Sequence, residues 1–148
     1  MNIQIVLEKF NHIFLDTAPV IYYLEKNPYF FTTVEPIFKY IQSGNIIAVT
    51  SPITLAECLI VPIRMKNSEL AQTYQKRIMH GKHTQFIAIN GNIGLKAAQL
   101  TAIYNLALSD AIQIATAIES NCDGFLTNDK RLKRVSDLHV LLVDEIIV

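Results

Sequence analysis

Short apolar runs recur along the chain and are separated by longer segments with helical spacing. The runs are rich in branched and aromatic residues and barely alternate with polar ones, which is typical of parallel strands buried on both faces. Five such runs predict strands at residues 13–15, 46–49, 86–89, 124–126 and 140–143. We therefore expect a central parallel sheet of about five strands.

The segments between these runs predict helices. Ser51 and Pro52 have the character of an N-cap and a first helical residue, and they open a helix that continues through Glu57. Further helices are expected over residues 68–82, 92–104 and 110–120, the last capped by Ser109. Because strands and helices alternate, the pattern predicts a three-layer α/β/α fold with helices on both faces of the sheet.

Composition narrows the class of protein. The 148 residues suit a single domain, which we expect to span residues 1–148. Apolar residues make up 51% and charged residues 18%, so a disordered chain is excluded. The formal net charge is zero, so a nucleic-acid site would need local basic clusters instead of a global excess.

Compartment signals are few. Cys58 and Cys122 lie in apolar stretches and are expected to be buried reduced thiols. The segment 1–10 carries Glu8 and Lys9 and does not have the character of a signal peptide. No window has the roughly 18 apolar residues of a membrane helix. We therefore expect a cytoplasmic protein without membrane association.

Four of the thirteen acidic residues stand where ligands bind in an open parallel sheet, outside the carboxyl ends of the strands. They are Asp16, Glu57, Asp110 and Asp129. Clustered carboxylates repel one another unless a cation compensates. All-oxygen ligands favour Mg²⁺ or Mn²⁺ over zinc. The positions therefore predict one acidic cleft that can hold a hard divalent cation.

Structural roles are the alternative for three of these acids taken singly. Asp16 and Asp129 could cap the segments that follow them, and Asp110 could complement a helix dipole. Glu57 lies two turns into an otherwise apolar helix, so capping does not explain it, and a solvated helix edge is its alternative. The other acids at strand ends are expected in turns (Asp123, Asp137) or in a frayed terminus (Asp144, Glu145).

The segments around the four acids resemble the motifs of PIN domains. Phe14-Leu15-Asp16-Thr17, followed by Val20-Ile21-Tyr22-Tyr23-Leu24, looks like their opening motif. The later motifs are similar to Thr54-Leu55-Ala56-Glu57, Leu108-Ser109-Asp110-Ala111 and Phe125-Leu126-Thr127-Asn128-Asp129. Order and spacing agree over nearly the whole chain. The small size is similar to that of VapC toxins of toxin–antitoxin pairs.

The resemblance implies an endoribonuclease that depends on Mg²⁺ or Mn²⁺. It implies that the four acids act in catalysis and hold one or two ions, directly or through waters. The expected supporting residues are Thr17, Thr127 and Asn128. The resemblance also implies a homodimer and a cognate antitoxin protein as partner.

Two basic clusters are candidates for RNA binding. Directly after Asp129, phosphate contacts are expected from Lys130, Arg131, Lys133 and Arg134. The second cluster, formed by Lys76, Arg77 and Lys82, is better explained as a solvated helix face.

Other folds that gather acids at strand ends fit less well. A phosphorelay receiver domain would need an aspartate after the third strand, where Asn90 stands. A phosphatase of the haloacid dehalogenase type would need Asp-x-Asp after the first strand, and Ala18 stands there instead. The remaining alternative is a non-catalytic PIN-like module that binds RNA or protein.

Overall fold

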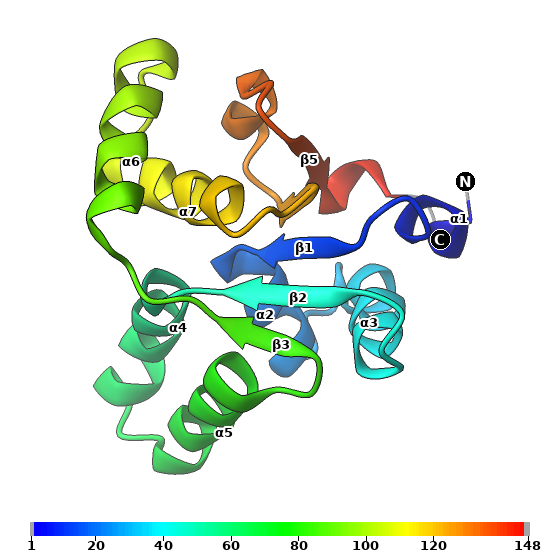
Figure 1. The fold of residues 1–148 in the computed structure, drawn as a ribbon. Helices are drawn as coiled ribbons and strands as arrows, with labels where there is room; N and C mark the ends of the chain where they lie inside the picture. Colours follow the sequence, from blue (N-terminus) through cyan, green and yellow to red (C-terminus); the bar gives the residue numbers. More distant parts are fainter. Residues whose placement is uncertain (1, 147–148) are drawn as a thin grey trace.

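The predicted strands form one parallel sheet in the computed structural model, which describes residues 2–146. The strands stand in the order β3-β2-β1-β4-β5. Their bounds are β1 (His12–Leu15), β2 (Ile47–Thr50), β3 (Thr84–Phe86), β4 (Gly124–Thr127) and β5 (His139–Leu142). Every neighbouring pair is parallel, so all carboxyl ends lie at one edge of the twisted sheet, and the arrows of β1, β2 and β3 point to the left in Figure 1.

Helices connect the strands and pack against the two faces of the sheet. They are α1 (Ile3–Leu7), α2 (Thr17–Leu24), α3 (Phe31–Gln42), α4 (Pro52–Arg64), α5 (Ser68–His80), α6 (Gly91–Tyr104) and α7 (Leu108–Glu119). Two 3-10 helices follow, η1 (Lys130–Arg134) and η2 (Val143–Glu145). In Figure 1, α4 and α6 lie on the side toward which the strand arrows point, and α1 lies at the opposite end.

Two separate apolar clusters cover the two faces of the sheet. On β1, Ile13 and Leu15 join one cluster and Phe14 joins the other. On β4, Leu126 and Phe125 divide in the same way. The first cluster is completed by α1 to α5, and the second by α6, α7 and η1. The structure thus confirms the three-layer α/β/α fold: β1 and β4 in the middle of the sheet are buried on both faces, whereas β3 at the edge is only partly covered.

The cap predicted for α4 is confirmed, whereas the one for α7 is wrong. The Ser51 hydroxyl accepts hydrogen bonds from the backbone N–H groups of Ile53 and Thr54. In contrast, α7 begins at Leu108 with Ala107 as its N-cap, so Ser109 lies inside the helix. Burial of the neighbouring Leu106 in the second cluster sets where the chain turns into α7, and this packing overrides the local preference of serine.

The third strand lies two residues earlier than predicted, at Thr84–Phe86. Its last bond to β2 is donated by the N–H of Ile87 to the carbonyl of Thr50. Since β2 ends there and α4 follows, residues 88 and 89 have no strand to pair with. The apolar pattern of residues 86–89 does not show that β2 ends at Thr50, so it does not predict where β3 must end.

The amino ends of β1 and β4 are joined by an aspartate. Both carboxylate oxygens of Asp123 accept from the backbone N–H of Asn11, at 2.9 and 3.2 Å, and one also accepts from that of His12 at 3.0 Å. The predicted turn role of Asp123 is confirmed.

Both cysteines are free and buried, as expected. None of the helices in residues 2–146 has the length and apolar character needed to cross a bilayer.

Candidate acidic site at the carboxyl ends of the strands

The sheet brings the four predicted acids to one edge. Asp16 follows β1 and Asp129 follows β4, which are hydrogen-bonded neighbours. Glu57 lies in α4, which leaves β2, and Asp110 lies in the first turn of α7. The charges of Glu57 and Asp110 both act on Asp16, and that of Asp129 acts on Asp110. The acids therefore form one electrostatically coupled group.

Asp16 is the most enclosed member of this group. Its Oδ1 accepts from the backbone N–H of Thr17 at 2.8 Å, and its Oδ2 accepts from the hydroxyl of Thr127 at 2.7 Å. Burial raises the pKa of Asp16 to about 6. The two hydrogen bonds oppose this rise, and the charges of Asp110 and Glu57 add to it. The cap predicted as an alternative role for Asp16 is therefore present, together with its place in the acidic group.

Two threonine hydroxyls connect the acids. The Thr17 hydroxyl donates to Glu57 Oε1 at 2.8 Å, so one residue holds both Asp16 and Glu57. The Thr127 hydroxyl is fully buried, donates to Asp16, and accepts from the backbone N–H of Asp129 at 3.1 Å. Glu57, Asp16 and the backbone of Asp129 thus belong to one chain of hydrogen bonds. Glu57 itself is exposed at the edge of α4.

Asp129 is paired within its own turn. Its carboxylate accepts from the backbone N–H of Arg131 at 3.0 Å, which makes it the N-cap of η1 as predicted. It also accepts from Arg131 Nε at 3.0 Å and Nη2 at 2.8 Å. The hydrogen-bonded guanidinium holds the pKa of Asp129 below its usual range.

Asp110 has no hydrogen-bond or ion-pair partner among the described residues 2–146. Burial raises the pKa of Asp110, the charge of Asp129 adds to the rise, and Arg131 opposes it. A partly buried carboxylate with like charges beside it favours any cation that reaches it.

The four carboxylates lie near enough to affect one another, but they do not converge on a single point. Within residues 2–146, no three acidic, histidine or cysteine side chains stand close enough to form a ready-made metal-ligand set. Their donor set is nevertheless all oxygen, which suits a hard cation that keeps several waters of its own. The arrangement therefore fits a divalent ion held partly through water.

Residues 13–138 match the model of the PIN domain family. The chain belongs to this family. No match was found among curated proteins. In this PIN domain, the four sequence motifs that contain the acids meet at the carboxyl ends of the strands.

Several solved structures, a toxin–antitoxin complex among them, have the same fold. A chain of VapBC2 from Rickettsia felis, bound to a promoter DNA fragment, has a TM-score of 0.69 and 18% identity, over 88% of this chain and 98% of that one. A toxin–antitoxin complex from Klebsiella pneumoniae gives 0.67 and 22%, over 90% and 99%. VapC20 of Mycobacterium tuberculosis, described as a toxin that cleaves the sarcin-ricin loop, gives 0.63 and 14%, over 76% and 86%.

One buried network of this PIN domain was not found from the sequence. The Ser51 hydroxyl donates to Gln113 Oε1, and Gln113 Nε2 donates to the Thr54 hydroxyl at 2.7 Å. Thr54 in turn donates to the carbonyl of Leu15 at 3.2 Å. The network ties the start of α4 to α7 and to the end of β1, and so positions the helices that carry two of the acids. The available signal was a lone amide between Ile112 and Ile114 in an apolar helix.

Asn128 joins the site to two other segments. Its side-chain amide donates to the Tyr22 hydroxyl of α2 at 3.2 Å, and its Oδ1 accepts from the backbone N–H of Asp144 at 3.0 Å. Asp144 and Glu145 therefore belong to an ordered turn, η2, and the expectation of a frayed terminus is wrong for them. The turn is held because Asn128 satisfies its backbone and β5 directly precedes it.

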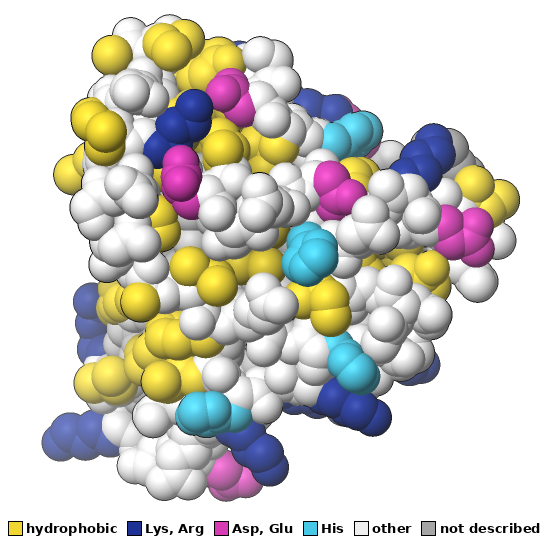
Figure 2. Space-filling model, viewed as in Figure 1, with side chains coloured by type: hydrophobic (Ala, Val, Ile, Leu, Met, Phe, Trp, Pro, Cys, Tyr) yellow, Lys and Arg dark blue, Asp and Glu magenta, His cyan; other side chains and the backbone are white. Residues whose placement is uncertain are grey.

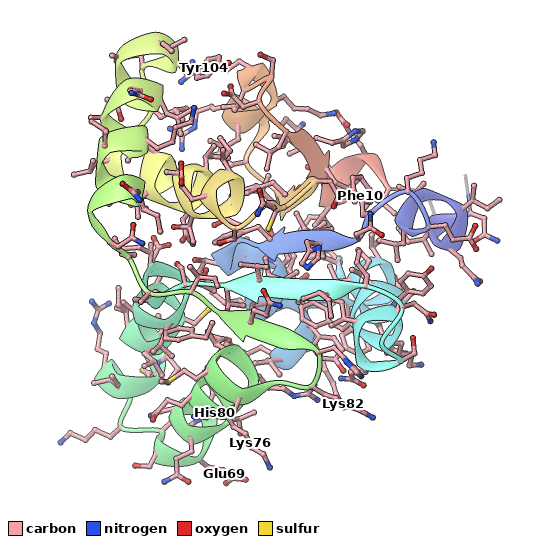
Figure 3. All side chains as sticks on the ribbon, in the orientation of Figure 1. Phe10, Glu69, Lys76, His80, Lys82 and Tyr104 are labelled. Atoms are coloured by element: carbon pink, nitrogen blue, oxygen red, sulfur yellow. The ribbon has the colours of Figure 1, made fainter. Side chains whose placement is uncertain are left out.

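The basic residues after Asp129 all have polar partners in the described structure. Lys133 lies 2.8 Å from Glu145, and Lys130 lies 3.9 Å from Asp144. The second basic cluster is elsewhere: Lys76 and Lys82 lie low in Figure 3, on and just after α5, away from α7. Their exposed positions agree with the solvated helix face that the sequence favoured.

Proposed function

We propose that this PIN domain is a Mg²⁺- or Mn²⁺-dependent endoribonuclease and the toxin of a toxin–antitoxin pair. One observation carries the proposal: the carboxylates of Glu57 and Asp16 and the backbone of Asp129 are joined through Thr17 and Thr127 at the edge where open parallel sheets bind ligands. The description of VapC20, a protein of the same fold, as an RNA-loop cleaving toxin supports it.

The proposed ligands are Asp16, Glu57, Asp110 and Asp129. When bound there, a divalent cation would polarise a phosphoryl oxygen and lower the pKa of a bound water. The protein supplies orientation: Thr127 aims Asp16 Oδ2, and Thr17 aims both Asp16 Oδ1 and Glu57. The carboxylate of Asp110, which has no polar partner within residues 2–146, remains available to a cation or to its water shell.

The RNA backbone would be held by charge next to the acids. The segment 130–134 presents its cations directly after Asp129, and its pairs with Asp144 and Glu145 are exposed. Exposed ion pairs contribute only about 0 to 1 kcal/mol, so phosphates can compete for these side chains. Phosphate contacts position the chain but do not read its sequence.

An RNA-cleavage assay with helix-matched variants tests the proposal. Wild type is expected to cut RNA with Mg²⁺ or Mn²⁺ and to lose the activity with EDTA. Asp110→Asn is expected to lose at least about a hundredfold in rate, since a ligand of the cation is removed. Glu119→Gln, an exposed change on the same helix, should leave the rate unchanged. Equal rates for the two variants would contradict the assignment, and RNA binding without cleavage would favour the non-catalytic module.

A partner protein is proposed for the apolar surface of α4. This surface consists of Ile60, Val61, Ile63 and Met65, whose exposed fractions range from 51% to 72%. Figure 2 shows hydrophobic side chains gathered on the left of the view, over α4 and α6. Exposed apolar patches mark protein-binding surfaces. Similar folds were solved as toxin–antitoxin complexes, so we assign this surface to an antitoxin.

Co-expression with the product of the neighbouring open reading frame tests this partner. Ile63→Glu is expected to weaken the complex at least about tenfold, because a charge would be buried in an apolar contact. Ile5→Glu, at a 55% exposed position of α1, is the control. Loss of the complex in both variants, or in neither, would reject the assignment. The homodimer stays a prediction, which analytical ultracentrifugation of the isolated chain can test.

A further inference from the structure

Arg131 forms an ion pair with Asp129, the only one of the four predicted catalytic acids that has an ion pair among residues 2–146. Its Nε donates to Asp129 Oδ1 at 3.0 Å, and its Nη2 donates to Asp129 Oδ2 at 2.8 Å. Both carboxylate oxygens are therefore engaged by one planar guanidinium. This two-point geometry is the strong form of an arginine–carboxylate contact.

The neighbouring basic residues behave differently. The partners of Lys130, Lys133 and Arg134 are Asp144, Glu145 and the carbonyl of Asn105. None of these partners is among the four acids of the site. Arg131 is also the cation whose charge opposes the raised pKa of Asp110. Its guanidinium thus lies at the acidic group itself, bonded to Asp129 and within electrostatic range of Asp110.

The ion pair between Arg131 and Asp129 lies where its guanidinium can move into solvent. The side chain of Arg131 is 73% exposed, whereas that of Asp129 is 24% exposed. When the exposed guanidinium leaves, water solvates its charge well and the long side chain regains rotamer freedom, and both effects offset part of the lost contact. The backbone bond from the N–H of Arg131 keeps Asp129 in place when the guanidinium leaves.

We propose that Arg131 is an internal counter-cation that competes with the divalent metal for Asp129. The proposal rests on the metal-dependent function proposed above. In this scheme, a cation that takes the lone pairs of Asp129 that Arg131 occupies displaces the guanidinium, and Arg131 then extends its charge into solvent. Arg131 is a positioning residue in this scheme, because it acts through Asp129.

Mn²⁺ binding, followed by the electron paramagnetic resonance signal of the free ion, tests the competition without any reaction. Arg131→Gln is expected to bind Mn²⁺ about fivefold more tightly than wild type, which corresponds to about 1 kcal/mol. Lys133→Gln removes the same charge from the same turn and should change the affinity less than about twofold. Arg131→Lys keeps the charge but lacks the two-point fork, so its affinity should fall between those of wild type and Arg131→Gln.

The outcomes separate the two proposals. If wild type binds Mn²⁺ and Asp16→Asn does not, but Arg131→Gln binds no more tightly than Lys133→Gln, the competition is rejected and the metal site stands. If neither wild type nor Arg131→Gln binds Mn²⁺, the metal-dependent function fails and takes the competition with it. Binding by Arg131→Gln alone would support the competition in its strongest form. Circular dichroism confirms that the variants are folded.

Discussion

At the scale of single residues, Asp16 shows that the acidic group lowers the stability of the folded chain. Its carboxylate is held by Thr17 and Thr127, yet burial and the charges of Asp110 and Glu57 still keep its pKa at about 6. The charged form of Asp16 is therefore destabilised in the folded chain relative to the unfolded one. Functional sites commonly hold groups in this condition.

Asp16→Asn is expected to stabilise the EDTA-treated protein at neutral pH. The folded-state pKa lies above the unfolded value, so the folded chain binds the proton more tightly, and the wild type loses stability as pH rises through about 6. The gain is about 1 to 3 kcal/mol at pH 7 and shrinks toward pH 4. Urea unfolding at both pH values measures it. A gain that is the same at both pH values would contradict the prediction.

The two thiols are expected to be unreactive in the folded protein. Burial raises the pKa of both Cys58 and Cys122 to about 12, so the nucleophilic thiolate is scarce near neutral pH. A colorimetric disulfide reagent at about pH 8 should label neither thiol until denaturant is added. Rapid labelling of either cysteine without denaturant would show that the segment around it opens locally.

At the scale of elements, a buried hydrogen-bond network holds α4 and α7 together. Their connection is the buried amide of Gln113, which accepts from Ser51 and donates to Thr54. Every polar atom of this network has a partner, so it orients the two helices without leaving an unpaired group in the core.

Gln113→Met is expected to lower the free energy of unfolding by about 1 to 3 kcal/mol. The change keeps side-chain length but leaves the buried hydroxyls of Ser51 and Thr54 with fewer partners. Gln75→Met, at an exposed position of α5, is the matched control and should be nearly neutral. Equal effects in thermal or urea unfolding would mean that the network contributes nothing specific.

Element boundaries show where local pattern is sufficient. Ser51 with Pro52 was correctly interpreted as a helix start, because the cap and the proline both act within one turn. Ser109 was wrongly interpreted as a cap, because burial of Leu106 decides where α7 begins. The third strand was displaced because its length depends on β2, its partner in the sheet.

At the scale of the whole molecule, two cores on opposite faces hold the sheet. Phe14 and Phe125 are opposed across β1 and β4, and their rings stack at 5.0 Å between centroids. Both side chains are fully buried in the second cluster. The two strands whose ends carry Asp16 and Asp129 are thus locked together by the core beneath the site.

Phe125→Ala is expected to destabilise the protein by about 3 to 5 kcal/mol, since it removes apolar contacts and leaves a cavity. Tyr29→Ala, at an 82% exposed position, should change stability by less than about 0.5 kcal/mol. Thermal unfolding of both variants measures the difference. A small effect of Phe125→Ala would mean that the second cluster repacks freely.

The sequence by itself determined the fold class, the number of strands and the four candidate acids, two directly after strands and two in helices. These depend on hydrophobic period and on position relative to a strand, both of which are local. Only the tertiary structure decided how Asp16 and the helices around it are held, because the partners come from distant segments: Thr127, which donates to Asp16, lies 111 residues from it, and Gln113, which accepts from Ser51, lies 62 residues from it. Strand order places β4 beside β1, and no local pattern specifies that neighbour.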